Sequence, residues 1–241
     1  MEISDLAILW DMDGTILDTF ELHYETWQET FAGRDITFNQ EIFRSHFGAN
    51  NRETVPIYLG YEPDDSTYTQ IANHKEELFR QQLSTKARLF PGVNGWFAYF
   101  ADHGAKQAIA SSANMENIEK VVDAFGIRHY FDTLVSGEDL PSKPAPDIFL
   151  RAARILGVPP ECCVVFEDSY HGVNAAKAAG MVSVGFASTA HFKPGDADFI
   201  LHTYAQDPAP IIQRILHLIE TRKLIQKEKE SQQSGRNLKR Q

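Results

Sequence analysis

The chain has 241 residues, of which 43% are hydrophobic and 23% are charged, and its formal net charge is −10. This composition is typical of a globular protein of one or two domains, and it excludes a chain that is disordered throughout or collagen-like. The negative net charge argues against nucleic-acid binding as the main function, and no apolar run approaches the ~20 residues that a membrane helix needs.

Short apolar runs recur along the chain, and they are nearly continuous rather than alternating. Such runs are typical of strands that are buried on both faces of a parallel sheet. Helical patterns lie between the later runs, and each ends at a glycine that suits a helix C-terminus. We therefore predict a doubly wound α/β fold. The expected strands are residues 6–10, 107–110, 133–135, 164–166, 182–186 and 198–201, and the expected helices are residues 114–125, 147–156 and 172–179.

Residues 20–84 interrupt this alternation, because they contain no convincing buried strand. Helical spacing covers residues 22–31, 41–47, 52–59 and 68–83, although Pro56 makes the third of these the weakest prediction. We therefore expect a helical domain of residues 20–84 inserted after the first strand. The α/β core would then consist of residues 1–19 and 85–221, followed by a basic tail of residues 222–241.

An acidic loop follows the first expected strand directly, with the sequence Asp11-Met12-Asp13-Gly14-Thr15. Asp11 would lie at the carboxyl end of a strand, where open α/β sheets bind their ligands. A carboxylate there can attack phosphorus or hold a metal. Gly14 permits a tight turn that brings Asp13 close, and two adjacent carboxylates need a cation such as Mg²⁺. The alternative interpretation is a polar turn that only closes a strand.

Three further features follow in order at the ends of later elements. Ser111 and Ser112 close the second core strand, where they can bind phosphate or merely cap a helix. Lys143 lies in a stiff Lys-Pro-Ala-Pro-Asp turn that could aim it at a fixed point, although most lysines face solvent. Glu167 and Asp168 follow a buried strand, where paired acids are costly unless they bind metal or are well paired.

The order of these four motifs resembles the haloacid dehalogenase superfamily, and most closely its β-phosphoglucomutase and sugar-phosphatase branch. The resemblance covers residues 6–186. It implies an α/β core of the Rossmann type with a helical cap inserted after the first strand. It also implies a Mg²⁺-dependent enzyme that acts on a phosphorylated small molecule.

The resemblance further implies a role for each matching residue. Asp11 would attack phosphorus to form an aspartyl phosphate, and Asp13 would be the general acid and base. Ser111 would bind the transferring phosphoryl group, and Lys143 would neutralise its charge. Mg²⁺ would be held by Asp11, the main-chain carbonyl of Asp13, Glu167 and Asp168. The implied substrate-binding residues are Thr15, His23, Arg52, Lys75, Ser112 and Asn114.

The residues after Ser112 decide between two activities of this branch. Its mutases have serine, lysine and asparagine there to grip a second phosphate, whereas this chain has Ala113, Asn114 and Met115. Alanine and methionine offer no side-chain donor. His23 points the other way, because it matches the mutase pattern. We therefore expect a phosphatase acting on a small phosphomonoester such as a sugar phosphate, with a β-phosphoglucomutase-type mutase as the alternative.

The sequence also argues against two other classes of protein and indicates a cellular compartment. A phosphorylated receiver domain would be about half as long and would need no helical insertion, and a catalytically inactive relative would be expected to lose Asp11 or Asp13. The adjacent Cys162 and Cys163 cannot form a disulfide framework, and no secretory signal is visible, so a cytoplasmic protein is expected. We expect a monomer that binds neither nucleic acid nor membrane.

The tail carries a charge opposite to that of the rest of the chain. Residues 222–241 hold seven Lys or Arg and two Glu, a net +5, which leaves −15 for the remainder. A basic tail can contact nucleic acid or a membrane. The interpretation we favour is a solvated helix end that leads into a flexible terminus.

Overall fold

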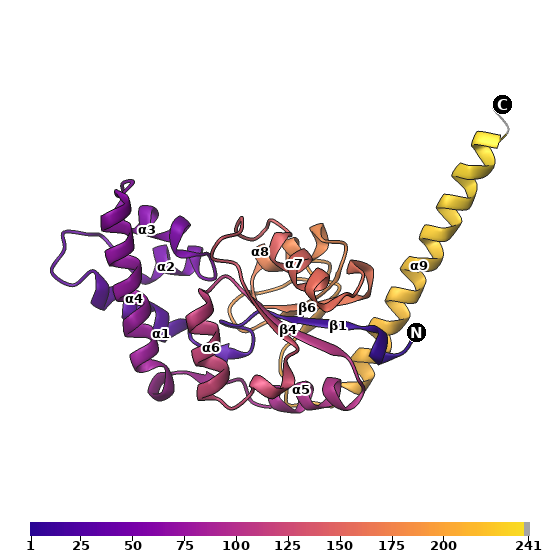
Figure 1. The fold of residues 1–241 in the computed structure, drawn as a ribbon, viewed down its shortest axis with the longest axis horizontal. Coiled ribbons are helices and arrows are strands. Elements are labelled where there is room, and N and C mark those ends of the chain that lie inside the picture. Colours follow the sequence, from indigo (N-terminus) through magenta and orange to yellow (C-terminus); the bar gives the residue numbers. More distant parts are fainter. Residues whose placement is uncertain (239–241) are drawn as a thin grey trace.

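A six-stranded parallel sheet forms the centre of the computed structural model (Figure 1). The structure describes the backbone of residues 1–238 and the side chains of residues 1–229 and 231. The strand order is β5-β4-β1-β6-β7-β8, with every neighbouring pair parallel. The strands are β1 (Ala7–Trp10), β4 (Lys106–Ser111), β5 (Thr133–Ser136), β6 (Cys163–Glu167), β7 (Val182–Phe186) and β8 (Phe199–Leu201).

Helices cover both faces of this sheet, which confirms the doubly wound α/β prediction. Successive residues of β1 face opposite sides: Ile8 and Trp10 belong to one buried apolar cluster, and Ala7 and Leu9 to another. The first cluster is completed by α5 (Val93–Asp102), α6 (Met115–Ala124) and α9 (Ala209–Leu238). The second is completed by α7 (Asp147–Leu156) and α8 (Tyr170–Ala178). Burial on both faces explains why the strands read as continuous apolar runs.

Four helices separate β1 from the rest of the core and lie at one end of the molecule (Figure 1). They are α1 (Phe20–Thr30), α2 (Gln40–His46), α3 (Asn51–Leu59) and α4 (Asp65–Lys86), and we call them the helical insertion. Seven mostly aromatic residues of the insertion form a third buried cluster of their own. Two short strands, β2 (Leu17–Asp18) and β3 (Arg88–Leu89), pair antiparallel where the chain leaves and re-enters the core.

The structure contains the weakest of the predicted helices and also several elements that the sequence analysis missed. The predicted helix around Pro56 forms, because Asn50 caps its N-terminus and Gly60 ends it in a left-handed conformation. The sequence analysis missed α5, whose aromatic residues pack on the sheet, and it missed the β2–β3 pair. It expected a helix end in residues 222–241 but no helix before them, whereas α9 already begins in the core and projects from it (Figure 1).

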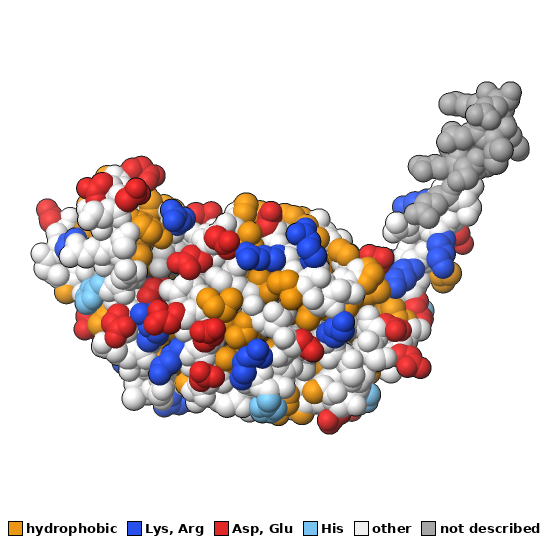
Figure 2. Space-filling view, in the orientation of Figure 1, with side chains coloured by type: hydrophobic (Ala, Val, Ile, Leu, Met, Phe, Trp, Pro, Cys, Tyr) orange, Lys and Arg blue, Asp and Glu red, His pale blue; other side chains and the backbone are white. Residues whose placement is uncertain are grey.

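The projecting part of α9 carries Lys and Arg side chains (Figure 2). Residues 239–241 of the predicted basic tail lie outside the described part of the chain. None of the described helices is long and apolar enough to span a membrane.

Candidate functional site

Three buried carboxylates meet at the carboxyl ends of adjacent strands. Trp10 lies beside Phe166 in the parallel register of β1 and β6, so the next residues, Asp11 and Glu167, are neighbours. Asp168 follows Glu167. One oxygen from each of Asp11, Glu167 and Asp168 lies within 4.8 Å of the others. The register of two parallel strands therefore produces the acidic cluster that the sequence predicted.

Lys143 reaches this cluster from the loop before α7. Its Nζ lies 2.5 Å from Asp11 Oδ1 and 2.7 Å from Glu167 Oε1, and the side chain is 5% exposed. Burial would lower the pKa of Lys143, but the two carboxylates outweigh it and hold the pKa above its ordinary value. Lys143 is therefore a permanent positive charge beside the Asp11 carboxylate, and its alternative interpretation as a solvent-facing lysine is excluded.

The cluster still carries more negative charge than Lys143 neutralises. Burial and, secondarily, Glu167 raise the pKa of Asp11 to about 7 against the effect of Lys143. Burial, Glu167 and Asp11 likewise raise the pKa of Asp168 well above its usual range. A hard divalent cation with oxygen ligands would remove this repulsion, so the residues present fit a Mg²⁺ site.

Close packing fixes the carboxylate of Asp168. Thr15 Oγ1 lies 3.2 Å from both Asp11 Oδ2 and Asp168 Oδ1, and the Thr189 hydroxyl donates to Asp168 Oδ2. Gly14 has a φ of +81°, and a Cβ there would come within 2.2 Å of the Asp168 carboxylate. Gly14 is therefore needed both for the turn and for the close approach of Asp168. The sequence analysis explained Gly14 by the turn alone.

Asp13 faces a different environment, which the helical insertion supplies. Its Oδ1 accepts hydrogen bonds from Thr19 Oγ1 at 2.7 Å and from His23 Nε2 at 3.0 Å. Burial would raise the pKa of Asp13, but His23 and Thr19 outweigh it and lower the pKa. Asp13 is therefore held as a carboxylate while Asp11, two residues earlier, has a raised pKa.

A chain of hydrogen bonds continues from His23 across the insertion and back to the core. Lys75 Nζ lies 3.0 Å from His23 Nδ1 and 3.0 Å from Glu76 Oε1. Since an ammonium can only donate, His23 Nδ1 accepts from Lys75 and His23 Nε2–H donates to Asp13. The Glu76 carboxylate accepts from Asn117, which is buried in α6 of the core.

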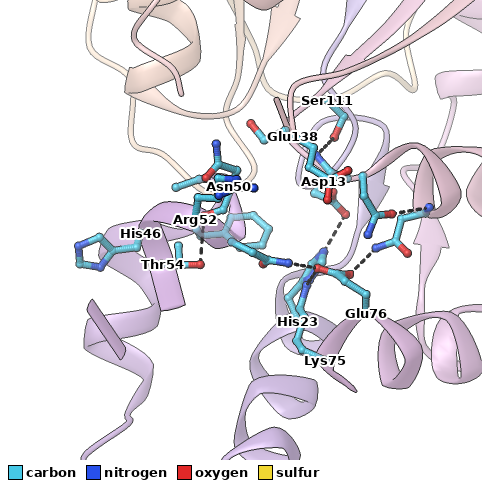
Figure 3. A pocket seen from close by; sticks show the side chains of 18 of the residues that line it. Asp13, His23, His46, Asn50, Arg52, Thr54, Lys75, Glu76, Ser111 and Glu138 are labelled. Atoms are coloured by element: carbon cyan, nitrogen blue, oxygen red, sulfur yellow. Dashed lines mark hydrogen bonds and ion pairs between the residues drawn. The ribbon is translucent and has the colours of Figure 1, made fainter. Parts of the chain in front are cut away.

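These residues line one pocket between the helical insertion and the strand ends, with Asp13, His23 and Ser111 facing it (Figure 3). Ser111 closes β4 and does not cap α6, because the Asn114 side chain accepts from Asn117 N. Ser111 Oγ instead accepts from Ala113 N at 3.2 Å. The pocket lining includes Asp11, Asp13, His23, Arg52, Lys75, Ser111, Ser112 and Asn114.

The structure thus brings all of the predicted site residues together in two adjoining groups. Asp11, Thr15, Lys143, Glu167 and Asp168 form the buried acidic cluster. The others line the pocket above it. The sequence analysis missed the pocket residues Asn50, Tyr68, Glu76, Asn117 and Glu138, and it missed Thr189 beside Asp168. Glu76 directly follows the predicted Lys75, and this adjacency was the only sign in the sequence that Glu76 belongs to the pocket.

Known proteins resemble this chain over most of its length. A family model described as haloacid dehalogenase-like hydrolase matches residues 6–180. The chain is 32% identical over 180 residues to the fructose-1-phosphate phosphatase YqaB of Escherichia coli, covering 74% of this chain and 94% of that protein. It is 32% identical over 187 residues to the β-phosphoglucomutase of Bacillus subtilis, covering 74% and 82% of the two chains.

A solved structure shows the same likeness in three dimensions. The structure of CbbY from Rhodobacter sphaeroides in complex with phosphate has a TM-score of 0.75 and is 32% identical in sequence. The match covers 86% of this chain and 96% of that one.

The raised pKa values predict that metal binding depends on pH. Asp11 has a pKa of about 7 when folded against 3.8 ordinarily, so between these values the folded protein holds a proton that the unfolded chain lacks. The stability of the metal-free protein should therefore fall as the pH rises through this interval. Mg²⁺ should raise the melting temperature at least twice as much at pH 8 as at pH 5, because at pH 8 it no longer competes with protons for the carboxylates.

Thermal melts with and without Mg²⁺ at the two pH values test this expectation. Asp168→Asn should remove most of the Mg²⁺ effect at pH 8. An equal Mg²⁺ shift at both pH values, or a full shift in Asp168→Asn, would contradict a metal site at these carboxylates.

Proposed function

The chain belongs to the haloacid dehalogenase-like hydrolases and is an enzyme of their phosphatase type, and we propose that it hydrolyses a small phosphomonoester through an aspartyl-phosphate intermediate with the help of Mg²⁺. The substrate we propose is a phosphorylated sugar or a similar metabolite. The relatives named above include a phosphatase of fructose 1-phosphate, which supports this class of substrate.

One observation carries the proposal, namely the contrast between Asp11 and Asp13. Asp11 lies against Lys143 and the other two acids, whereas Asp13 lies against His23 and Thr19. Two carboxylates that are close in sequence and differ in environment can divide the work of nucleophile and of proton carrier. Both line the same pocket.

In the proposed reaction Asp11 attacks the phosphorus atom of the substrate, and the bond to the leaving oxygen breaks. Lys143 stabilises the negative charge that spreads over the phosphoryl oxygens, and Ser111 donates a hydrogen bond to one of them. A Mg²⁺ ion held by Asp11, Glu167, Asp168 and the Asp13 carbonyl would neutralise charge on the phosphoryl group. Water then attacks the aspartyl phosphate and releases inorganic phosphate.

Asp13 moves the proton in both halves of this cycle. In its protonated form it donates to the leaving oxygen of the substrate, and as a carboxylate it then takes a proton from the attacking water. The bonds from His23 and Thr19 favour the carboxylate, which is the form that the second half requires.

The helical insertion would act as a cap over this chemistry. We propose domains of residues 20–84 for the cap and of residues 1–19 and 85–221 for the catalytic core, followed by a basic tail of residues 222–241 that begins within α9. A cap that contributes His23 next to Asp13 would exclude bulk water from the pocket. We further propose that the enzyme is a cytoplasmic monomer, a setting with which the free, buried Cys162 and Cys163 agree.

Hydrolysis is favoured over phosphoryl migration by the residues that follow Ser111. A mutase must hold a second phosphate firmly while the intermediate turns over. Ala113 and Asn114 line the pocket and carry no charge, and Met115 is not among its lining residues. The relation to a β-phosphoglucomutase and the His23–Asp13 bond keep the mutase as the second candidate.

The nucleophile assignment predicts the effect of Asp11→Asn. This change keeps the shape of the side chain but removes the attacking carboxylate, so phosphate release should fall by roughly three orders of magnitude or more. Steady-state phosphate release from a panel of sugar phosphates with Mg²⁺ measures it, and excess EDTA should abolish activity in the unmodified enzyme. Full activity under either condition would falsify the aspartyl-phosphate mechanism.

The proton-transfer assignment predicts a different result for Asp13→Ala. Turnover should fall about a hundred-fold or more, because general acid and base catalysis is lost. The Mg²⁺ concentration for half-maximal rate should change little, because the proposed ligand is the main-chain carbonyl, which the variant retains. The role fails if the metal requirement moves while kcat at saturating Mg²⁺ does not.

The proposed preference for hydrolysis over migration of the phosphoryl group predicts which of two products forms faster. With β-glucose 1-phosphate and a trace of glucose 1,6-bisphosphate, free phosphate should appear faster than glucose 6-phosphate. Ala113→Ser with Asn114→Lys should move the ratio toward glucose 6-phosphate by about ten-fold, because one charge-assisted hydrogen bond is worth roughly 1.5–3 kcal/mol.

Assaying both products in the same reaction tests this choice. Asn114 also caps α6, so a melting curve must accompany the double variant. Glucose 6-phosphate forming much faster than free phosphate in the unmodified enzyme would make it a mutase.

A further inference from the structure

Glu76 is an acid that lines the pocket in which the substrate is proposed to bind. It lies on α4 of the helical insertion, lines the substrate pocket and is only 6% exposed. Its carboxylate accepts three hydrogen bonds: from Lys75 Nζ at 3.0 Å, from Asn51 Nδ2 at 2.7 Å and from Asn117 Nδ2. Three donors from two elements of the insertion and one of the core thus hold Glu76 in place (Figure 3).

These contacts keep Glu76 negatively charged. Burial would raise the pKa of Glu76, but the charge of Lys75 and the hydrogen bonds from Asn51 and Lys75 outweigh it and lower the pKa. The charge of Glu76 lies directly against that of Lys75, and both side chains are at least nine-tenths buried. The pair therefore presents almost no net charge to a substrate, although Lys75 alone would attract an anion.

The remaining charges above the catalytic carboxylates also balance. Arg52 makes no ion pair with any described residue, and its guanidinium lies over the Tyr68 ring at 5.5 Å. Glu138, an exposed acid, lines the same pocket. The two cations, Arg52 and Lys75, thus face the two acids, Glu76 and Glu138.

Uncharged hydrogen-bonding groups make up much of the other polar lining. They are Asn50, Thr54, Tyr58, Tyr68, Ser112 and Asn114. Hydroxyl and amide groups of this kind suit the hydroxyl groups of a polyol or sugar. They offer little to a second phosphate, which requires net positive charge.

We infer that Glu76 is a specificity-determining residue, which neutralises Lys75 in the pocket so that the enzyme prefers a phosphomonoester with an uncharged, hydroxyl-bearing remainder over one with a second anionic group. This inference rests on the proposed function, because it concerns the substrate that the same pocket admits. Glu76 acts through Lys75 and through the charge of the pocket, and it takes no part in phosphoryl transfer.

The test compares the binding of glucose 6-phosphate and of glucose 1,6-bisphosphate. Calorimetric titration in Mg²⁺ buffer uses the full chain with Asp11→Asn, so that neither ligand is consumed. Glu76→Gln in this background keeps the side-chain length and removes the charge. The ratio of the bisphosphate Kd to the monophosphate Kd should fall about ten-fold, as expected for one charge in a partly screened pocket.

Glu77→Gln is the matched control, because Glu77 is the next residue of α4, is exposed and bonds only to Arg80 and Gln81 among the described side chains. It should leave the ratio unchanged. Lys75→Gln should raise the ratio, and adding Glu76→Gln to it should lower the ratio again. That comparison decides the question if the single Glu76→Gln variant does not fold.

The outcomes separate the two proposals. An unchanged ratio in folded Glu76→Gln, in an enzyme whose unmodified form releases phosphate from monophosphates, would overturn the inference and leave the proposed function intact. Equal shifts in Glu76→Gln and Glu77→Gln would also overturn the inference. Binding of neither ligand, together with no phosphate release by the unmodified chain, would overturn both.

Discussion

Repulsion among buried carboxylates is the constraint on which the rest of the site depends. Asp11, Glu167 and Asp168 meet at two strand ends, and Lys143 supplies one positive charge among them. Buried charges without partners are costly, so the surrounding structure has to compensate. Hydroxyl donors on Asp168 and the raised pKa values of Asp11 and Asp168 are the local consequences.

Contact with the helical insertion lowers the pKa of Asp13, an effect that the core alone would not produce. Asp11 and Asp13 share one loop, and Asp11 is buried while Asp13 is nearly so, yet their pKa values move in opposite directions. The difference comes from His23, which α1 brings to Asp13 and which Lys75 of α4 orients. A cap that moved away from the core would break this contact. In the proposed mechanism, covering the pocket and preparing Asp13 for proton transfer would thus be coupled by one hydrogen bond.

Sequence reasoning predicted most of the core because burial on both faces leaves a direct signal. The apolar runs marked the six strands of the parallel sheet, and the polar residues that were expected to form the site lie at the carboxyl ends of β1, β4 and β6. The same reasoning missed α5, because Gly95 within it lowers helix propensity, although its buried residues Val93, Trp96, Phe97 and Phe100 have helical spacing. It missed Glu76 and Thr189, because their importance lies in contacts with residues far away in sequence.

The position of Glu76 links substrate choice to the joining of insertion and core. The carboxylate that neutralises Lys75 also accepts the bond from Asn117, so it contacts both sides of the pocket. Arg80, one turn further along α4, bonds to the other side of the Asn117 amide and to Glu116. A substrate that drew Lys75 toward a second phosphate would pull it from Glu76 and leave that carboxylate buried with one donor fewer. Losing that hydrogen bond would destabilise the contact between the insertion and the core. A bisphosphate would therefore be disfavoured both by the charge of the pocket and by weaker packing of the insertion on the core.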